Sequence, residues 1–391
     1  MLNKTMIELG TRRSCIRELF EYGNKRAAEI GRENVYDYSL GNPSVPTPHK
    51  VQVVLKDLIE KDDGKSLHGY TSAGGCLSAR KAVADDLNER YGSDIKPGDI
   101  FITCGAAPAL TAAIRAVSCP GSEVIGLAPY FPEYAVFVTE NGSRFVPVEA
   151  DLDSFQINFA DLEKKLNAHT QAIIVNSPNN PSGAVYTPQT LRKLADLLTE
   201  RAKAYGHPIY ILSDEPYREL LYDDAELSFV PAIYPDTVIC YSWSKSLSLP
   251  GERIGYVCVP ECVTDAPLFM AAVAGASRSQ GHVCAPALMQ YMVSRCISLR
   301  PDIEAYDKNR KTLYDALSSY GYSCVKPQGA FYLFVRAPGG DSQAFSDKAK
   351  AKDLLIVPGN DFGCPEYFRI STCVSYEMIL KSLPVFESLI R

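Results

Sequence analysis

A lysine and a set of anion-binding side chains lie close together in one stretch of the chain. Residues 241–256 read YSWSKSLSLPGERIGY, which places Lys245 just after Ser242 and Ser244 and eight positions before Arg253. A lysine amine can form a Schiff base with a carbonyl group, while hydroxyls and a guanidinium can hold a phosphate. A site for pyridoxal phosphate needs both functions. Taken in isolation, the pattern also fits a strand followed by a polar loop with a solvated lysine.

The elements that position this segment are predicted by short apolar runs that alternate with longer helical patterns. The apolar runs cover residues 100–103, 123–127, 172–175, 209–212, 238–241 and 255–259, and the helical patterns cover 109–117, 131–138 and 190–205. The runs are apolar throughout, whereas a strand with one solvated face alternates apolar and polar residues. The sequence therefore predicts an α/β fold in which helices flank a mainly parallel central sheet.

Residues that can do chemistry follow four of these predicted strands. They are Gly105 with its neighbours, Asn180, Asp214 and Lys245. Ligands of parallel sheets bind beyond the carboxyl ends of the strands. Because four strands lead to such residues, we expect one shared site at that edge of the sheet.

The two ends of the chain have a different pattern. A long helix is predicted over residues 286–317, followed by strands at 330–335 and 367–371, which together suggest a smaller α+β unit. The segment before residue 47 has no βα unit of its own, and we expect it to pack with this second unit. The predicted domains are a large one over residues 47–285 and a small one formed by 1–46 and 286–391.

Composition excludes several classes of function. The 391 residues carry a formal net charge of −6, so no basic excess exists to bind nucleic acid or an anionic membrane surface. No apolar run is long enough to span a membrane, and no signal peptide is evident. The twelve cysteines are scattered, and the five histidines show no ligand spacing. These features predict a cytoplasmic protein with reduced thiols and no structural metal.

Taken in order, the motifs resemble class I aminotransferases, of PLP fold type I and similar to aspartate aminotransferases. The resemblance runs from Gly41 in GNP to Arg369 in YFRIS and covers nearly the whole chain. Each motif is weak to moderate in specificity, and their ordered combination is strong. The resemblance implies pyridoxal 5'-phosphate as the cofactor, bound to Lys245.

The resemblance also implies a set of contacts to the phosphate. Gly105, Ala106 and Ala107 lie between a predicted strand and a helix expected to start near Pro108, where backbone N–H groups and the helix dipole favour an anion. Ser242, Ser244 and Arg253 would complete this phosphate cup. The sequence departs here from family members that carry Ser or Thr in the loop, so hydroxyl contacts are lost, whereas backbone contacts need not be. A routine βα turn is the alternative for the isolated loop.

Around the pyridine ring, the resemblance assigns four side chains. Asp214 in SDEPY would keep the ring nitrogen protonated, which makes the ring a better electron sink. Tyr217 and Asn180 would donate hydrogen bonds to the phenolic oxygen of the ring. Phe131 in APYFP would stack on the ring, with Tyr130 as the alternative. A loop or helix-capping carboxylate, a Pro/Gly turn and a core phenylalanine are the structural alternatives for these motifs.

Substrate binding and assembly are implied in the same way. Arg369 lies in an apolar strand, where a guanidinium fork can hold the α-carboxylate of an amino acid, and the Gly41 backbone would close over that group. A structural salt bridge is the alternative for Arg369. Tyr70 in HGYT resembles the tyrosine that reaches the phosphate of the neighbouring subunit, which implies a homodimer; a surface tyrosine is the alternative.

These observations predict a transaminase that moves an amino group between an L-amino acid and a 2-oxo acid. The mechanism would be ping-pong through an aldimine at Lys245, with Asp214 and Tyr217 as further catalytic residues. A β-eliminating C–S lyase or an aminocyclopropane-carboxylate-synthase-like enzyme could use the same site. The chain lacks the basic N-terminal extension of related regulators that bind DNA. The sequence leaves open which amino acid binds and whether Arg278 or His282 contacts it.

Overall fold

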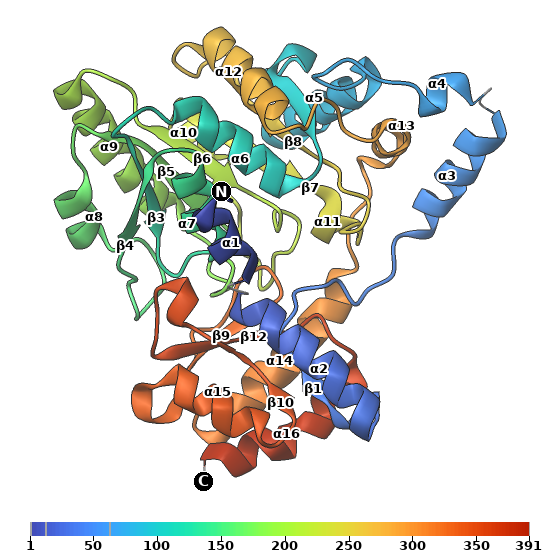
Figure 1. The fold of residues 1–391 in the computed structure, drawn as a ribbon, viewed down its shortest axis with the longest axis vertical. Helices are drawn as coiled ribbons and strands as arrows, with labels where there is room; N and C mark the ends of the chain where they lie inside the picture. Colours follow the sequence, from blue (N-terminus) through green and yellow to red (C-terminus); the bar gives the residue numbers. More distant parts are fainter. Residues whose placement is uncertain (1, 12–13, 62–63, 391) are drawn as a thin grey trace.

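A seven-stranded sheet forms the centre of the fold (Figure 1). The computed structural model describes residues 2–11, 14–61 and 64–390. The strand order is β2-β8-β7-β6-β5-β3-β4, and neighbours are parallel except at β8, which is antiparallel to β2 and β7. The strands are β2 (Ile100–Thr103), β3 (Glu123–Leu127), β4 (Arg144–Val148), β5 (Thr170–Asn176), β6 (Tyr210–Asp214), β7 (Thr237–Ser242) and β8 (Gly255–Cys258). The predicted α/β fold with a mainly parallel sheet is confirmed.

Strand β4 is absent from the sequence prediction, and its composition explains why. Arg144 and Pro147 are exposed on this strand, whereas Val146 and Val148 are buried. The strand pairs only with β3, so it forms one edge of the sheet. An edge strand tolerates a proline and a solvated face, and it therefore lacks the continuous apolar run of the central strands.

Helices cover both faces of the sheet. Successive strand residues point to opposite faces, and both sets are apolar in the central strands, so each face is buried by helices. Val124 and Leu212 pack in a cluster with α6 (Ala106–Val117), α7 (Glu133–Glu140) and α12 (Ala266–Ser279). Their neighbours Ile125 and Ile211 pack in a second cluster. That cluster includes residues of α8 (Phe159–Lys165), α9 (Pro188–Tyr205) and α10 (Val230–Ile233).

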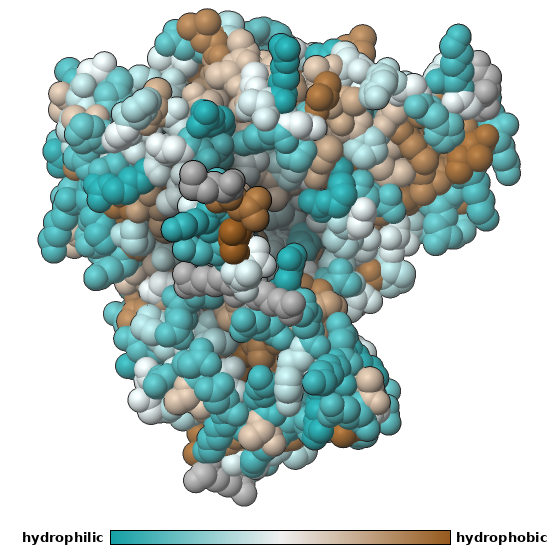
Figure 2. All heavy atoms as spheres, viewed as in Figure 1, coloured by the Kyte–Doolittle hydropathy of each residue, from teal (hydrophilic) through white to brown (hydrophobic). Residues whose placement is uncertain are grey.

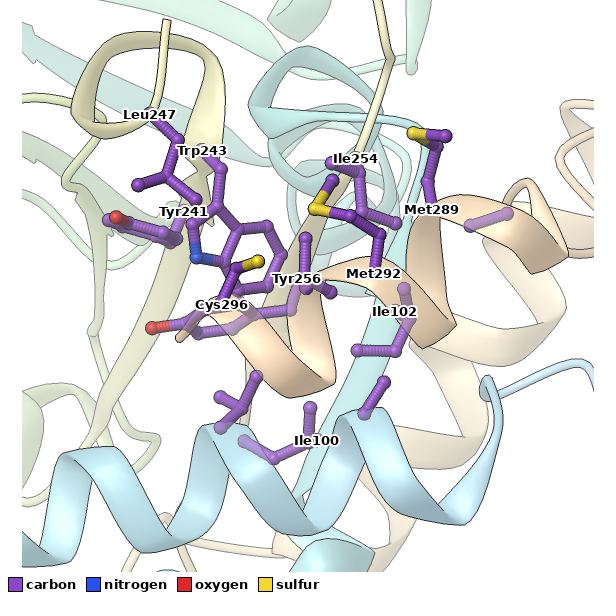
Figure 3. Close-up of a cluster of buried hydrophobic side chains, with 14 of the residues drawn as sticks. Ile100, Ile102, Tyr241, Trp243, Leu247, Ile254, Tyr256, Met289, Met292 and Cys296 are labelled. Atoms are coloured by element: carbon purple, nitrogen blue, oxygen red, sulfur yellow. The ribbon is translucent and has the colours of Figure 1, made fainter. Parts of the chain in front are cut away.

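A third cluster joins the β2–β8–β7 end of the sheet to helices from distant parts of the chain (Figure 3). Ile102, Trp243 and Tyr256 contribute from the sheet side, and Met289 and Met292 contribute from α13. The helices of this region are α3 (His49–Lys61), α4 (Lys65–His68), α5 (Leu77–Tyr91) and α13 (Ala287–Cys296), and the short helix η2 (Pro97–Asp99) precedes β2. Lys245 is on α11 (Trp243–Ser246), which this cluster anchors through Trp243.

The C-terminal part forms a separate antiparallel sheet with the order β11-β12-β9. Its elements are α14 (Ile303–Tyr320), β9 (Tyr332–Arg336), η3 (Pro338–Gly340), α15 (Ser342–Lys350), β11 (Val357–Pro358), η4 (Asn360–Phe362), β12 (Tyr367–Ser371) and α16 (Tyr376–Ile390). In Figure 1 this α+β unit lies below the seven-stranded sheet. This unit is the smaller α+β unit that the sequence predicts for the C-terminal part.

The N-terminal segment packs against this C-terminal unit. Strand β1 (Tyr36–Asp37) pairs in parallel with β10 (Leu354–Leu355), and Arg26 on α2 (Cys15–Ile30) forms an ion pair with Asp353 at 2.7 Å. The remaining elements of this segment are α1 (Lys4–Thr11) and η1 (Arg32–Asn34). The division into domains at residues 46 and 285 stays a proposal that agrees with these contacts.

Two predicted elements of the C-terminal part need correction. The single helix expected over residues 286–317 is two helices, α13 and α14. Pro301 lacks an N–H and disfavours helical backbone in the residue before it, and Asp302 then caps α14 by accepting a hydrogen bond from the Ala305 N–H at 3.2 Å. The strand expected at 330–335 begins later, at Tyr332, because Ala330 adopts a positive φ of 57°.

The cysteines are not paired with one another. All twelve are free thiols, of which Cys119 and Cys262 are exposed and the others are buried or half-buried. Over the described residues, no group of three or more His, Cys, Asp or Glu side chains is arranged to hold a metal ion. Within the same residues, no helix combines the length and apolarity needed to cross a membrane.

Candidate active site

A cavity of about 270 Å³ lies where β5, β6 and β7 end. Its lining comes from both sheets, the N-terminal segment and the start of α6. The predicted site residues that line it are Gly41, Ala106, Ala107, Phe131, Asn180, Asp214, Tyr217, Ser242, Ser244, Lys245, Arg253 and Arg369. Gly105 is next to Arg253 but does not itself line the cavity, and neither does Tyr70. The fold therefore brings together residues that are more than 300 positions apart in the sequence.

Lys245 follows β7 by less than one helical turn, so its amine enters the cavity from the sheet edge. Its Nζ donates a hydrogen bond to the carbonyl of Gly41 at 2.7 Å and lies 5.5 Å from the centre of the Phe331 ring. Burial lowers the pKa of Lys245 to about 8, and the charges of Arg369 and Arg253 add to this decrease. An amine with this pKa is partly neutral near pH 7, and a neutral amine is a nucleophile and a base.

Asp214 ends β6 and turns its carboxylate towards the cavity. Tyr134 donates a hydrogen bond to Oδ2, and Asn176 donates from Nδ2 to the Asp214 backbone carbonyl at 2.8 Å. Oδ1 is buried, and no hydrogen-bond partner for it exists among the described residues. Burial raises the pKa of Asp214 to about 7, and Glu215 adds to the increase while the Tyr134 hydrogen bond opposes it. A buried carboxylate oxygen without a partner can accept a hydrogen bond from a cationic N–H donor.

The other end of the cavity is an anion-binding corner at the start of α6. Gly105 adopts a φ of 104°, and a Cβ there would lie 2.7 Å from the Arg253 guanidinium. The position therefore requires glycine, and it keeps Arg253 against the turn. The first residues of α6, Ala106 and Ala107, line the cavity there and offer backbone N–H groups to an anion. The arginine is fixed by a hydrogen bond to the Pro250 carbonyl at 2.8 Å.

Arg369 occupies the centre of β12 and is only 2% exposed. It donates hydrogen bonds to Asn180 Oδ1 at 3.1 Å and to the Ser39 carbonyl at 2.6 Å. Its guanidinium lies over the rings of Tyr332 and Phe362, at 4.7 and 5.1 Å from their centres. Among the residues that the structure describes, no carboxylate pairs with it, and its buried Nε has no partner. This excludes the structural salt bridge within the described chain and leaves a buried cation that faces the cavity.

Two tyrosines form the wall between Asp214 and Arg369. The hydroxyls of Tyr217 and Tyr332 lie 3.0 Å apart, and burial raises the pKa of Tyr332 to about 12. Burial also holds the pKa of Tyr217 well above its ordinary value, so both side chains remain neutral donors. The hydroxyl of Tyr332 would lie 2.0 Å from a Cβ at position 41, and the close approach therefore requires Gly41.

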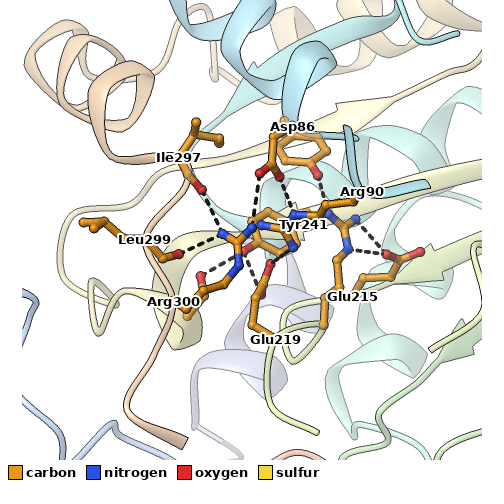
Figure 4. Close-up of polar contacts among 11 residues, drawn as sticks. Asp86, Arg90, Glu215, Glu219, Tyr241, Ile297, Leu299 and Arg300 are labelled. Atoms are coloured by element: carbon orange, nitrogen blue, oxygen red, sulfur yellow. Dashed lines mark hydrogen bonds and ion pairs between the residues drawn. The ribbon is translucent and has the colours of Figure 1, made fainter. Parts of the chain in front are cut away.

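A network of buried charges supports the back of the site (Figure 4). Glu219, downstream of β6, accepts hydrogen bonds from Arg90 and from the Tyr241 hydroxyl, both at 2.9 Å. Tyr241 also lies 2.8 Å from the Ser246 hydroxyl on the helix that carries Lys245. These hydrogen bonds connect the segment after β6 with β7 and α11, and they help to fix the positions of these elements relative to one another.

Comparison with known proteins identifies the family. The family model for aminotransferases of class I and II matches residues 33–383. The chain belongs to this family of transaminases. An aspartate aminotransferase from Thermotoga maritima is 30% identical over 366 residues, covering 92% of each chain. The crystal structure of an aminotransferase from Eubacterium rectale is 52% identical with a TM-score of 0.97, covering 100% of this chain and 98% of that chain. The Thermus thermophilus aspartate aminotransferase, solved with maleate, is 26% identical with a TM-score of 0.86, covering 100% and 99%.

Four residues that the sequence analysis named lie outside the cavity lining of the aminotransferase. Tyr130 packs edge-on against Phe145 at 5.1 Å between ring centres, whereas Phe131 lines the cavity. Arg278, in the last turn of α12, is exposed, and His282 does not line the cavity either. Tyr70 is 98% exposed in the turn between α4 and α5.

Several residues of the aminotransferase site carry no signal in the sequence. Tyr134 is an ordinary aromatic in a helical pattern, and only the packing of α7 brings its hydroxyl to Asp214. Tyr332 likewise reads as a core residue of a predicted strand. Asn176 does carry a signal, because it is a polar residue directly after a buried apolar run. The position of such a residue at a strand end can be used to find it.

Proposed function

We propose that this transaminase moves an amino group between an L-amino acid and a 2-oxo acid by a ping-pong mechanism that uses pyridoxal 5'-phosphate at Lys245. The observation that carries the proposal is the arrangement of three buried groups around one cavity. These are a lysine with a lowered pKa, together with a carboxylate oxygen and an arginine that have no hydrogen-bond partner and no counter-ion, respectively, in the described part of the chain. Each group matches a different part of the cofactor–substrate pair.

The residues of the cavity fit the cofactor in charge and position. Asp214 Oδ1 would accept a hydrogen bond from a protonated pyridine nitrogen, with Phe131 stacked on the ring. The N–H groups at the start of α6 would hold the phosphate, together with Ser242, Ser244 and Arg253. The alanines at positions 106 and 107 leave these backbone donors intact. When bound, pyridoxal phosphate supplies an electron sink that makes the Cα proton of an amino acid acidic.

The chain's own residues then orient the amino acid and move its proton. Arg369, whose guanidinium lies over the rings of Tyr332 and Phe362, would bind the α-carboxylate. The backbone of Gly41 would close over the same carboxylate. Lys245, once free, would take the proton from Cα as a general base, for which a pKa near 8 is well suited. Tyr217 and Asn180 would donate to the phenolic oxygen of the ring.

Exposed apolar side chains support a homodimer as the working form. Val53 and Ile59 on α3 are 44% and 59% exposed, and Leu77 at the start of α5 is 63% exposed. In Figure 2, brown side chains gather on the arm formed by α3. Tyr70 belongs to the same region and would reach the phosphate of the neighbouring subunit. Sedimentation equilibrium is expected to give twice the chain mass; a monomer at micromolar concentration would contradict the dimer.

The cytoplasm is the location that we propose. The twelve free thiols support this location, because such thiols persist in a reducing compartment.

Arg369→Lys is expected to lower kcat/KM for amino acids roughly 10- to 100-fold, mainly by raising KM. A lysine keeps the positive charge but loses the planar fork that binds a carboxylate through two parallel hydrogen bonds. Arg336→Lys on the neighbouring strand β9 is the matched control, because Arg336 is exposed and outside the cavity. An unchanged KM in the Arg369 variant would show that another group binds the α-carboxylate.

A panel of amino donors with several 2-oxo acids tests the proposed reaction. The loaded enzyme is expected to form a new 2-oxo acid from the donor and a new amino acid from the acceptor, with parallel lines in double-reciprocal plots. The β-eliminating alternative predicts instead pyruvate and ammonia from cysteine conjugates without any acceptor. Elimination without amino transfer would therefore reject the proposal.

A further inference from the structure

Tyr332 connects the C-terminal antiparallel sheet with the residues around the active-site cavity. It is the first residue of β9, and its buried side chain lines the cavity. Three groups from distant parts of the chain meet it there: the hydroxyl of Tyr217, the guanidinium of Arg369 and the backbone of Gly41. A side chain that contacts residues proposed for both the cofactor and the substrate can influence the binding of both.

The pairing of β9 with β12 explains why Tyr332 lies beside Arg369. In this antiparallel pair Tyr332 is opposite Ser371, and Phe334 is opposite Arg369. Side chains two positions apart on a strand point to the same face, so Tyr332 and Arg369 are diagonal neighbours on one face of the sheet. The guanidinium lies 4.7 Å from the centre of the Tyr332 ring, which is within the range of a cation–π interaction. The ring therefore supports Arg369.

The hydroxyl of Tyr332 reaches Tyr217, which follows the central strand β6. The two hydroxyl oxygens lie 3.0 Å apart, and the two rings meet edge to face with 5.7 Å between their centres. Phe331, the residue before Tyr332, packs edge-on against the same Tyr217 ring at 5.5 Å. Two consecutive aromatic residues of the C-terminal part therefore hold Tyr217. Gly41 leaves the space that the Tyr332 hydroxyl occupies, because a Cβ there would lie 2.0 Å from it.

The hydrogen bond between the two hydroxyls has one direction when Tyr217 donates to the phenolic oxygen of the cofactor. A phenol carries a single proton, so Tyr217 can then only accept from its neighbour, and the Tyr332 O–H is the donor. Burial keeps the pKa of both phenols above the ordinary value, so both protons are present at neutral pH. A hydroxyl that accepts a hydrogen bond becomes a stronger donor itself.

We propose that Tyr332 is a positioning residue of this aminotransferase, whose hydroxyl strengthens the hydrogen bond that Tyr217 donates and whose ring holds Arg369 in place. The proposal rests on the proposed function and adds a residue to its site. Substitution separates the two roles. Phenylalanine removes only the hydroxyl, whereas leucine removes the hydroxyl and the aromatic face together.

Spectrophotometric titration of the enzyme loaded with pyridoxal phosphate tests the hydroxyl. With the cofactor joined to Lys245, the lysine nitrogen and the ring oxygen share a proton, and its loss changes the visible band. The ring oxygen is more negative after this loss, so a hydrogen bond donated to it favours the loss. Tyr332→Phe should therefore move the titration midpoint to higher pH by about 0.3 pH unit. Tyr217→Phe should move it by about one pH unit, the effect of a whole hydrogen bond to a charged group.

A double variant distinguishes this role from a merely structural one. On the Tyr217→Phe background, Tyr332→Phe should not move the midpoint further, because its hydroxyl acts through Tyr217. Tyr322→Phe is the matched control: its buried hydroxyl donates to the Phe386 carbonyl at 2.9 Å in the core of the C-terminal unit, and its loss should leave the midpoint unchanged. An unmoved midpoint in Tyr332→Phe, or a further rise in the double variant, would overturn the role of the hydroxyl. If the wild type forms no such band, the proposed function fails instead.

Steady-state kinetics with amino donors test the ring. Tyr332→Phe retains the aromatic face, so KM for the amino acid should change less than about twofold, whereas Tyr332→Leu should raise KM about three- to tenfold through the lost cation–π contact. Circular dichroism shows whether each variant is folded. If the leucine variant does not fold, Tyr332→Met, with a longer side chain, takes its place with the same expected KM. Equal KM values in the phenylalanine variant and a folded aliphatic variant would overturn the role of the ring.

Discussion

Replacing Lys245 with alanine is expected to abolish amino transfer, with a loss of about 10⁴-fold or more, the upper range for a positioned general base. The amine is the only lysine group in the lining of the described cavity, and its lowered pKa suits it to both nucleophilic and base roles. The variant should also lose the visible absorbance band of the cofactor joined covalently to the protein. Stopped-flow kinetics and an absorption spectrum of the purified, loaded protein measure the two effects.

Lys193→Ala provides the matched control for this experiment. Lys193 is exposed on α9, where its amine lies 4.2 Å from the centre of the Phe159 ring, outside the cavity. Its removal should leave both turnover and spectrum unchanged. An unaltered absorption band in Lys245→Ala would show that the cofactor is attached elsewhere and would reject the site assignment.

Asp214→Asn is expected to have the second largest effect, lowering kcat/KM by about 10²- to 10³-fold, as removal of a preorganised electrostatic group does. The neutral amide can still accept the Tyr134 hydrogen bond, so local packing should be preserved. It cannot keep a pyridine nitrogen protonated, because the negative charge at the buried Oδ1 position is gone. The same substitution leaves Lys245 and Arg369 in place, and cofactor attachment should therefore persist.

The cofactor-free variant should be more stable than the cofactor-free wild type, and increasingly so as the pH rises. Burial raises the folded-state pKa of Asp214 from 3.8 to about 7, so the folded wild type holds this proton more tightly than the unfolded chain does. The tighter proton binding of Asp214 contributes fully to the free energy of unfolding below pH 3.8. This contribution is lost progressively as the pH rises to about 7. Three pKa units correspond to about 4 kcal/mol. The asparagine variant lacks this loss.

Thermal unfolding of both cofactor-free proteins between pH 5 and 8 measures this difference. The gap in Tm should widen up to about pH 7, the folded-state pKa, and then stay constant. Asp196→Asn, at an exposed position on α9, should match the wild type at each pH. A gap that is independent of pH would mean that Asp214 is already ionised or paired in the cofactor-free protein. Retention of full activity in Asp214→Asn would reject its role at the ring.

Local sequence determined the strands and the residues that follow them. The central strands bury both faces, so their apolar runs mark β2 and β3 with the correct bounds and locate the other buried strands within two residues. Because parallel strands end at one edge, the positions of Asp214 and Lys245 after such runs already predict that they share a site. The edge strand β4 has no continuous apolar run, because one of its faces is solvated, and its sequence therefore does not identify it as a strand.

Only the tertiary structure decided how the site is completed. Lys245 is held by Gly41 from 204 positions away, Arg369 meets Ser39 across 330 positions, and Tyr134 reaches Asp214 across 80. Such contacts depend on how the N-terminal segment and the antiparallel sheet pack onto the central sheet, and no local periodicity encodes that packing. The same packing leaves Asp214 Oδ1 without a hydrogen-bond partner among the described residues and places Arg369 against the rings of Tyr332 and Phe362. The residue types therefore predict the kind of chemistry, whereas the shifted pKa values arise from burial and long-range contacts.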